Sequence, residues 1–180
     1  VELGGKDIDT LTHCIILEEM MAVEPGFAAT FHQVWRLAQH IGRVGTEEQK
    51  EKFLKPFAED DTGLLSIGQT EPGSGTDNTF PYRGVDGGIK LSAVKEGGEW
   101  LLNGTKHFVA CATTARIFIV IGRTDPHAPA PEGATQFLMW RDTPGFRIGR
   151  THDKVGGALL MNAELILENV RVPESDVLMG

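Results

Sequence analysis

The sequence predicts an α+β fold, in which helices of an all-α domain are followed by an antiparallel β-barrel or sandwich. Apolar residues recur at helical spacing between residues 10 and 61, and short apolar runs separated by glycine-rich turns follow Gly63. No G-x-G-x-x-G segment joins a strand to a helix, which disfavours a Rossmann cofactor domain. We therefore divide the chain into a helical part, residues 1–62, and a β part, residues 63–180.

Three helices are expected in the first part. Two amphipathic helices are separated by the helix-breaking pair Pro25-Gly26. The third begins at Thr46, whose hydroxyl suits a capping box with Gln49, and we expect Pro56 to end or kink it.

Seven short apolar runs predict strands in the second part, without helices between them. Asn103-Gly104 suits a type I′ turn, because both central residues of that turn need positive φ, and it predicts a hairpin at this point. The runs are Leu64 to Ile67, Ile89 to Val94, Trp100 to Leu102, Phe108 to Cys111, Ile117 to Ile121, Phe137 to Trp140 and Ala163 to Leu167.

Composition narrows the classes of partner. The 180 residues carry a formal net charge of -8, which disfavours a nucleic acid or an anionic membrane surface as a partner. The apolar run Ile117 to Ile121 is far shorter than the roughly 20 residues of a membrane-spanning helix, so we expect no membrane insertion.

The cysteines and histidines show no recognised ligand spacing. Cys14 and Cys111 are far apart, which favours a reducing, cytoplasmic compartment over a disulfide framework. Among the histidines, His13, His107, His127 and His152 have no partner at a metal-ligand or hydrolase spacing, so we predict no metal site.

The stretch from Gln69 to Asp77 stands out as a candidate site. It places a threonine, glycines, a serine and a second threonine directly after a predicted strand. Two interpretations fit these residues: a loop whose exposed amides hold a polar ligand, or a tight turn in which Asp77 accepts from local amides.

Four stretches, in the same order, resemble the acyl-CoA dehydrogenase family. Thr70 to Asp77 resembles that family's T-E-P-G-x-G-S-D signature, with Thr76 in place of serine. The others are Gly45 to Lys50, Leu102 to Lys106 and Glu164 to Pro173. The resemblance implies the end of an N-terminal helical domain and a middle β-barrel domain that binds FAD and acyl-CoA.

The resemblance also assigns roles to residues after the first predicted β-strand. Thr70 matches the threonine that hydrogen-bonds the flavin pyrimidine edge, and Thr76 matches a serine near the cofactor phosphates and the CoA portion of the substrate. Backbone groups of Ile67, Gln69 and Gly75 match further flavin contacts.

A second cofactor stretch follows Leu102 to Lys106. Phe108 and Ala110 match a tryptophan and a hydroxyl residue that contact the flavin in the family. Ala110 cannot supply the hydrogen bond near flavin N5 that the hydroxyl residue gives. Alternatively, both residues belong to the core of a half-buried strand.

Three residues of the second helix match the end of the family's acyl pocket: Phe31, His32 and Trp35. Their bulk suggests a short or ring-bearing acyl group. The alternative is that Phe31 and Trp35 only pack together at i, i+4 while His32 is solvated.

The implied reaction is FAD-dependent dehydrogenation of an acyl-CoA to a trans-2-enoyl-CoA. In the family the catalytic glutamate belongs to a C-terminal helical domain beyond Gly180, so we nominate no catalytic residue and expect the isolated chain to be inactive. A flavin-type electron acceptor protein and a homodimer or homotetramer are the implied partners. The alternatives are a flavin monooxygenase or nitroalkane-oxidase-like enzyme of the same fold, and a non-catalytic fragment.

Overall fold

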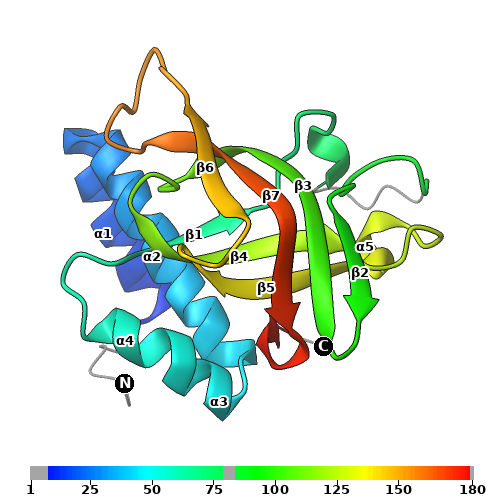
Figure 1. Ribbon diagram of the computed structural model, residues 1–180. Helices are drawn as coiled ribbons and strands as arrows, with labels where there is room; N and C mark the ends of the chain where they lie inside the picture. The colour runs from blue at the N-terminus through cyan, green and yellow to red at the C-terminus, as the bar shows by residue number, and fades with distance from the viewer. Residues whose placement is uncertain (1–7, 79–83, 179–180) are drawn as a thin grey trace.

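Helices lie against one side of a curved sheet in this protein. The computed structural model describes residues 8–78 and 84–178. The main helices, α1 to α4, come first along the chain, and eight strands follow with one short helix, α5 (Ala130–Gly133), among them (Figure 1). The predicted α+β fold is confirmed.

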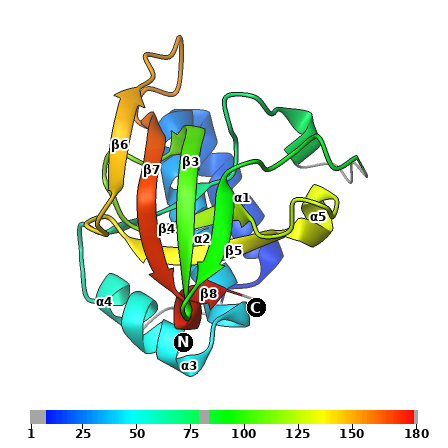
Figure 2. The same ribbon diagram turned by 45° about the vertical axis from the view of Figure 1, so that its right-hand side comes forward.

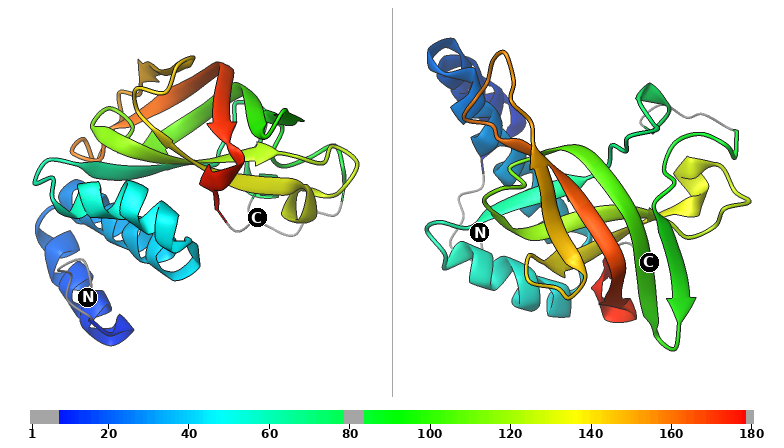
Figure 3. Two further views of the ribbon diagram at one scale, coloured as in Figure 1. Left: turned by 60° about the horizontal axis from the view of Figure 1, so that its bottom comes forward. Right: turned by 45° about the horizontal axis from the view of Figure 1, so that its top comes forward.

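The first two helices meet at Pro25. Helix α1 (Thr10–Val23) is capped by Asp9, whose Oδ1 accepts from Thr12 N at 2.9 Å, and helix α2 (Pro25–Val44) is capped by Glu24. Pro25 stands at the start of α2, where the missing N–H would have no intrahelical partner in any case. Helix α2 lies between α1 and the sheet (Figure 3).

The capping box predicted at Thr46 is confirmed. Its Oγ1 accepts from Gln49 N at 3.2 Å, and Gln49 Oε1 accepts from Thr46 N at 3.1 Å. The helix passes from α3 (Glu47–Gln49) through a π-helical turn, η1 (Lys50–Leu54), to α4 (Lys55–Ala58). Pro56 lacks the N–H that would continue the α-helical ladder, and the wider π turn falls directly before it.

The strands form one open, mixed sheet in the order β6-β7-β3-β2-β4-β5-β8, with β1 paired to β4 (Figure 2). Strands β6 and β8, at the two ends of this order, do not pair with each other within the described residues, so the expected barrel is not closed. The strands are β1 (Leu64–Gly68), β2 (Ser92–Glu96), β3 (Glu99–Ala110), β4 (Ala115–Arg123), β5 (Ala134–Trp140), β6 (Phe146–Thr151), β7 (Asn162–Pro173) and β8 (Val177–Leu178).

The prediction that every strand is antiparallel is wrong at β4. Strand β1 runs parallel to β4, with Leu65 opposite Ile117 and Gly68 opposite Val120. Strand β2 also pairs with β4 in parallel, through Ser92 opposite Arg123. Parallel neighbours need a long crossover, which is usually a helix. Here the β2–β3 hairpin lies within the crossover, so the absence of a helical pattern was a misleading signal.

The predicted hairpin turn at Asn103-Gly104 is also wrong. The β2–β3 turn is made by Gly97 and Gly98, with φ of 58° and 89°, whereas Asn103 and Gly104 lie inside β3 at an irregularity in its pairing with β7. Gly104 has φ 145°, and a Cβ added there would lie 3.0 Å from a Leu91 side-chain carbon. Both glycine-containing pairs tolerate positive φ, so local turn chemistry did not distinguish them.

Strand β4 separates two hydrophobic cores. Its buried residues alternate, so Ile117 and Ile119 pack toward α2 while Phe118 and Val120 pack into the core within the curved sheet. A strand buried on both faces reads as a continuous apolar run, as Ile117 to Ile121 does. Each fully buried side chain of this size contributes roughly 1.5–3 kcal/mol.

Candidate functional site

A buried ion pair holds the candidate loop against β3. Glu71 Oε1 accepts from Lys106 Nζ at 2.7 Å, and the two side chains are 7% and 0% exposed. The Glu71 carboxylate also accepts from the backbone N–H groups of Lys90 and Leu91, at 2.9 Å each. These hydrogen bonds stabilise the negative charge of Glu71, as a buried carboxylate requires.

Two further bonds place Thr70 beside β3. Lys106 Nζ donates to Gln69 O at 3.1 Å, and His107 N donates to Thr70 O at 2.7 Å. Burial lowers the pKa of Lys106, and the charge and hydrogen bond of Glu71 oppose that shift. The loop therefore leaves β1 in one defined direction.

Asp77 closes the other end of the loop. Its carboxylate accepts from Gly75 N and from Gly88 N, at 2.7 Å each, and these bonds lower the pKa of Asp77. The turn interpretation is therefore correct for Asp77. A Cβ added at Gly73 or Gly75 meets no atom within 4 Å, so the backbone is open at both positions. The interpretation of this stretch as a ligand-holding loop stays a prediction.

The residues matched to flavin contacts differ in exposure along the loop. Ile67 and Thr70 are half-buried, whereas Gly75 and Thr76 are exposed. Gln69 is half-buried, and its Nε2 donates to Asn78 O at 2.9 Å. Among the described residues, the hydroxyls of Thr70 and Thr76 make no hydrogen bond. Both hydroxyls therefore remain available to a ligand.

Phe108 is not a core residue. It is 56% exposed and has φ 53°, and its ring lies 4.2 Å from that of His107 and 4.5 Å from that of His152. The alternative that Phe108 belongs to the core of a half-buried strand is therefore wrong, and its contact with a flavin stays a prediction. Ala110 is half-buried, and its carbonyl accepts from Ser66 Oγ at 2.6 Å.

The helical candidates separate into two groups. Phe31 and Trp35 line an apolar cavity of about 600 Å³, and their rings meet edge to face at 5.7 Å. His32 lies apart from that lining, and its Nδ1 is 3.4 Å from His13 Nε2. Burial, with the positive charges of His13 and Arg36, lowers the pKa of His32. The other lining residues are Ile8, Ile16, Met20, Phe27, Thr30, Val34, Ala38, Phe57 and Leu64.

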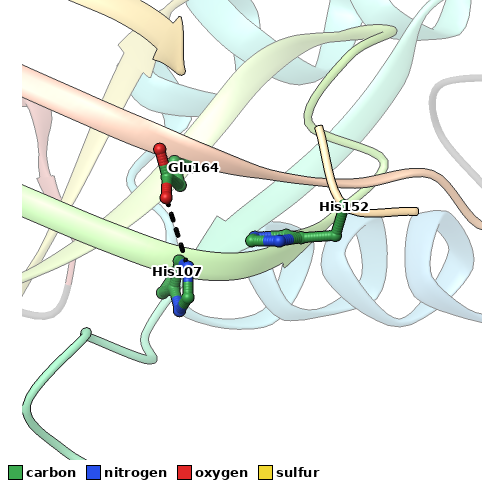
Figure 4. Close-up of side chains that lie close together, drawn as sticks. All are labelled: His107, His152 and Glu164. Atoms are coloured by element: carbon green, nitrogen blue, oxygen red, sulfur yellow. Dashed lines mark ion pairs between the residues drawn. The ribbon is translucent and has the colours of Figure 1, made fainter. Parts of the chain in front are cut away.

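One cluster was missed from the sequence: His107, His152 and Glu164 converge beside Phe108 (Figure 4). His107 Nε2 lies 3.2 Å from Glu164 Oε1. The three residues come from different segments of the β domain, and no spacing rule joins them. Only the pairing of the strands that carry them brings them together.

Comparison with known families identifies the chain. Residues 66–170 match the model of the acyl-CoA dehydrogenase middle domain, and residues 1–61 match that of the acyl-CoA dehydrogenase N-terminal domain. The chain belongs to the acyl-CoA dehydrogenase family. The family resemblance drawn from the four motifs is thereby confirmed.

Individual members of the family are similar over nearly the whole chain. The short-chain specific acyl-CoA dehydrogenase of Megasphaera elsdenii is 35% identical over 97% of this chain, and the cyclohex-1-ene-1-carbonyl-CoA dehydrogenase of Geobacter metallireducens is 31% identical over 97%. The structure of butyryl-CoA dehydrogenase from Megasphaera elsdenii superposes with a TM-score of 0.87, 34% identity and 99% coverage of this chain. The chain spans 44% of each of these two relatives and 45% of that structure.

The structure also bears on the membrane prediction. Within residues 8–78 and 84–178, no helix has the length and apolar character needed to cross a membrane.

Proposed function

We propose that this chain is the flavin-holding part of an FAD-dependent acyl-CoA dehydrogenase. The observation that carries this proposal is the Thr70–Asp77 loop, which the buried Glu71–Lys106 pair fixes against β3, the strand that also carries the exposed Phe108. Membership of the acyl-CoA dehydrogenase family supports the reaction class.

The residues present fit FAD. The open rim at Gly73 and Gly75 accommodates a ligand close to the backbone, and the hydroxyls of Thr70 and Thr76 have no protein partner among the described residues. When bound, FAD supplies the acceptor for the hydride that leaves the acyl chain.

Each site residue then has a proposed role toward the cofactor. Thr70 donates to the flavin pyrimidine edge, where a fixed donor favours the reduced, negatively charged form. The backbone groups of Ile67, Gln69 and Gly75 bind the cofactor, and Thr76 binds its phosphates and the CoA portion of the substrate. Phe108 offers an aromatic face, whereas Ala110 adds no hydrogen bond.

The acyl group is proposed to be short or ring-bearing. The cavity that Phe31 and Trp35 line is apolar, and both rings form part of its wall. The two relatives described above are named for a short-chain and a cyclohexene substrate, which supports the same size class. His32 does not line this cavity, so we propose for it only an indirect effect through His13.

We propose the dehydrogenase activity for the complete protein. Because the chain spans under half of its relatives' length, we expect the 180 residues alone to hold FAD weakly and to turn over no acyl-CoA. In the complete protein, an oligomeric assembly and an external flavin-type electron acceptor are the expected partners, because the reduced cofactor must pass its electrons on.

The test is a purified complete protein assayed with short-chain and cyclic acyl-CoAs and an artificial electron acceptor. We expect one FAD per chain and formation of the 2-enoyl-CoA. A colourless protein, or a flavoprotein that consumes oxygen with other substrates and leaves acyl-CoA unchanged, would overturn the proposal. The second outcome would favour the flavin monooxygenase or nitroalkane-oxidase-like alternative.

A further inference from the structure

The cluster of His107, His152 and Glu164 is produced by a bulge in β3. Lys106 pairs with Leu165 and Val109 with Ala163, so two residues of β3, His107 and Phe108, lie opposite one residue of β7. A bulge of this kind re-aims side chains, and here it turns His107 toward Glu164. His152 follows β6, the strand that pairs with β7 on its other side.

The side chains of the cluster offer three donor atoms of metal-ligand type. The Nε2 atom of His152 is buried, although the residue as a whole is only half-buried, and it has no hydrogen-bond partner among the described residues. This nitrogen is therefore not engaged by another described group of the protein. The backbone holds the residue in position, since His152 N donates to Asn162 O at 2.8 Å.

The cluster holds the donor types that a metal ion needs. His107 and His152 each carry an imidazole, and Glu164 carries a carboxyl group whose Oε1 lies beside His107 Nε2. Metal ions bind the neutral form of an imidazole and the ionised form of a carboxyl group.

The spacing matches a small transition-metal ion. The three ligand atoms lie within 4.8 Å of one another, and His107 Nε2 is 3.2 Å from Glu164 Oε1. Tetrahedral zinc, with bonds of about 2.0–2.2 Å, places its ligand atoms about 3.3 Å apart. The remaining distances therefore need to shorten by about 1.5 Å at most when a metal binds.

We propose that His107, His152 and Glu164 bind one divalent transition-metal ion of the zinc class. Two imidazoles and one carboxylate favour such an ion over calcium or magnesium, which prefer oxygen ligands. Three protein ligands leave a coordination position open to water or a small anion. The bound metal joins β3, β7 and the end of β6, next to the ring of Phe108.

The positive charge of Arg150 opposes the binding of a metal ion beside Glu164. Its Nε lies 3.9 Å from Glu164 Oε1, and its side chain is 72% exposed. The guanidinium therefore has room to move into solvent when a metal takes its place beside the carboxylate. Removing it by Arg150→Gln should strengthen metal binding severalfold.

The test titrates the 180-residue chain, stripped with chelator, with ZnSO4 and CoCl2 against a chromophoric chelator. We expect one Zn²⁺ per chain, and with Co²⁺ the strong visible bands of a tetrahedral nitrogen and oxygen site. Glu164→Gln and His152→Gln should each weaken zinc binding at least about tenfold, since losing even a supporting partner of a ligand typically costs that much.

Matched controls separate this site from other histidines. His127→Gln changes an exposed histidine outside the cluster, and His13→Gln removes one member of the His13–His32 pair. Both should leave the affinity within twofold of the unmodified chain. Circular dichroism of each variant, after metal has been removed with chelator, checks that it is folded. His107→Gln is measured in place of any cluster variant that does not fold. The absence of stoichiometric zinc binding, or equal affinity in the cluster variants and the controls, would overturn the proposal.

Discussion

Lys106 donates to Glu71 across 2.7 Å inside the protein, and this pair joins the loop that leaves β1 to the middle of β3. Gln69 O and Glu71 share the same ammonium group, so one lysine orients both sides of Thr70. Where the candidate cofactor loop leaves β1, a buried ion pair with β3 therefore sets its direction.

Replacing this lysine should be strongly destabilising. Lys106→Met leaves the buried Glu71 carboxylate without its counter-ion, and breaking a buried pair in this way costs about 3–5 kcal/mol. The free energy of unfolding in urea measures the effect. Lys95→Met, which removes the half-exposed partner of Glu174, should cost about 0–1 kcal/mol. Equal losses in the two variants would show that the buried pair does not hold the loop.

Acid should loosen the same loop through Asp77. The folded-state pKa of Asp77 is below its ordinary value of 3.8, because Gly88 N and Gly75 N donate to it. The stabilisation is therefore present above pH 3.8 and is lost as the pH falls through the lowered pKa. Between pH 5 and pH 3, Asp77→Asn should lose less unfolding free energy than the unmodified chain. Asp61→Asn, at an exposed position, should follow the unmodified chain, and identical curves for all three would contradict the role of Asp77.

Thr70 should tune the cofactor in the complete protein. Thr70→Val removes a donor to a group that becomes charged on reduction, which is worth about 1.5–3 kcal/mol. For a two-electron couple this corresponds to a reduction potential lower by about 30–60 mV. Spectroelectrochemical titration measures the shift. Thr10→Val, at the exposed start of α1, is the matched control, and an unchanged potential in Thr70→Val would remove Thr70 from the cofactor site.

Trp35 should limit the length of the acyl chain. Trp35→Ala enlarges the cavity between α1 and α2. The ratio of kcat/KM for longer acyl-CoAs to kcat/KM for short ones should therefore rise in the complete protein. Each 1.4 kcal/mol of new apolar contact raises this ratio about tenfold. Leu11→Ala, which removes an exposed side chain of α1 outside the cavity, should leave the preference unchanged. If Trp35→Ala loses stability without changing chain-length preference, the residue serves only packing with Phe31 and His13.

Interactions between residues close in sequence were sufficient to predict the helix starts of the first part and the family. Pro25 and the Thr46 capping box set helix starts through groups within a few residues, which is why their positions were predictable. The Thr70–Asp77 motif likewise lies within one short segment, and it carried the family resemblance that the comparison confirms. The exposed ring of Phe108 resolved an alternative that the motif left open, because burial depends on what packs from elsewhere.

Contacts between distant segments decided the rest. The parallel pairing of β1 with β4 and the turn at Gly97-Gly98 depend on which strands meet, and turn chemistry alone fits more than one register. The Glu71–Lys106 pair and the convergence of His107, His152 and Glu164 require β3 to lie between its actual neighbours. By itself the sequence determined the helix starts and the family, because both depend on residues that are close together in the chain. Tertiary structure alone decided where buried charges and distant ligands meet, because side chains far apart in sequence come together only when strands pair.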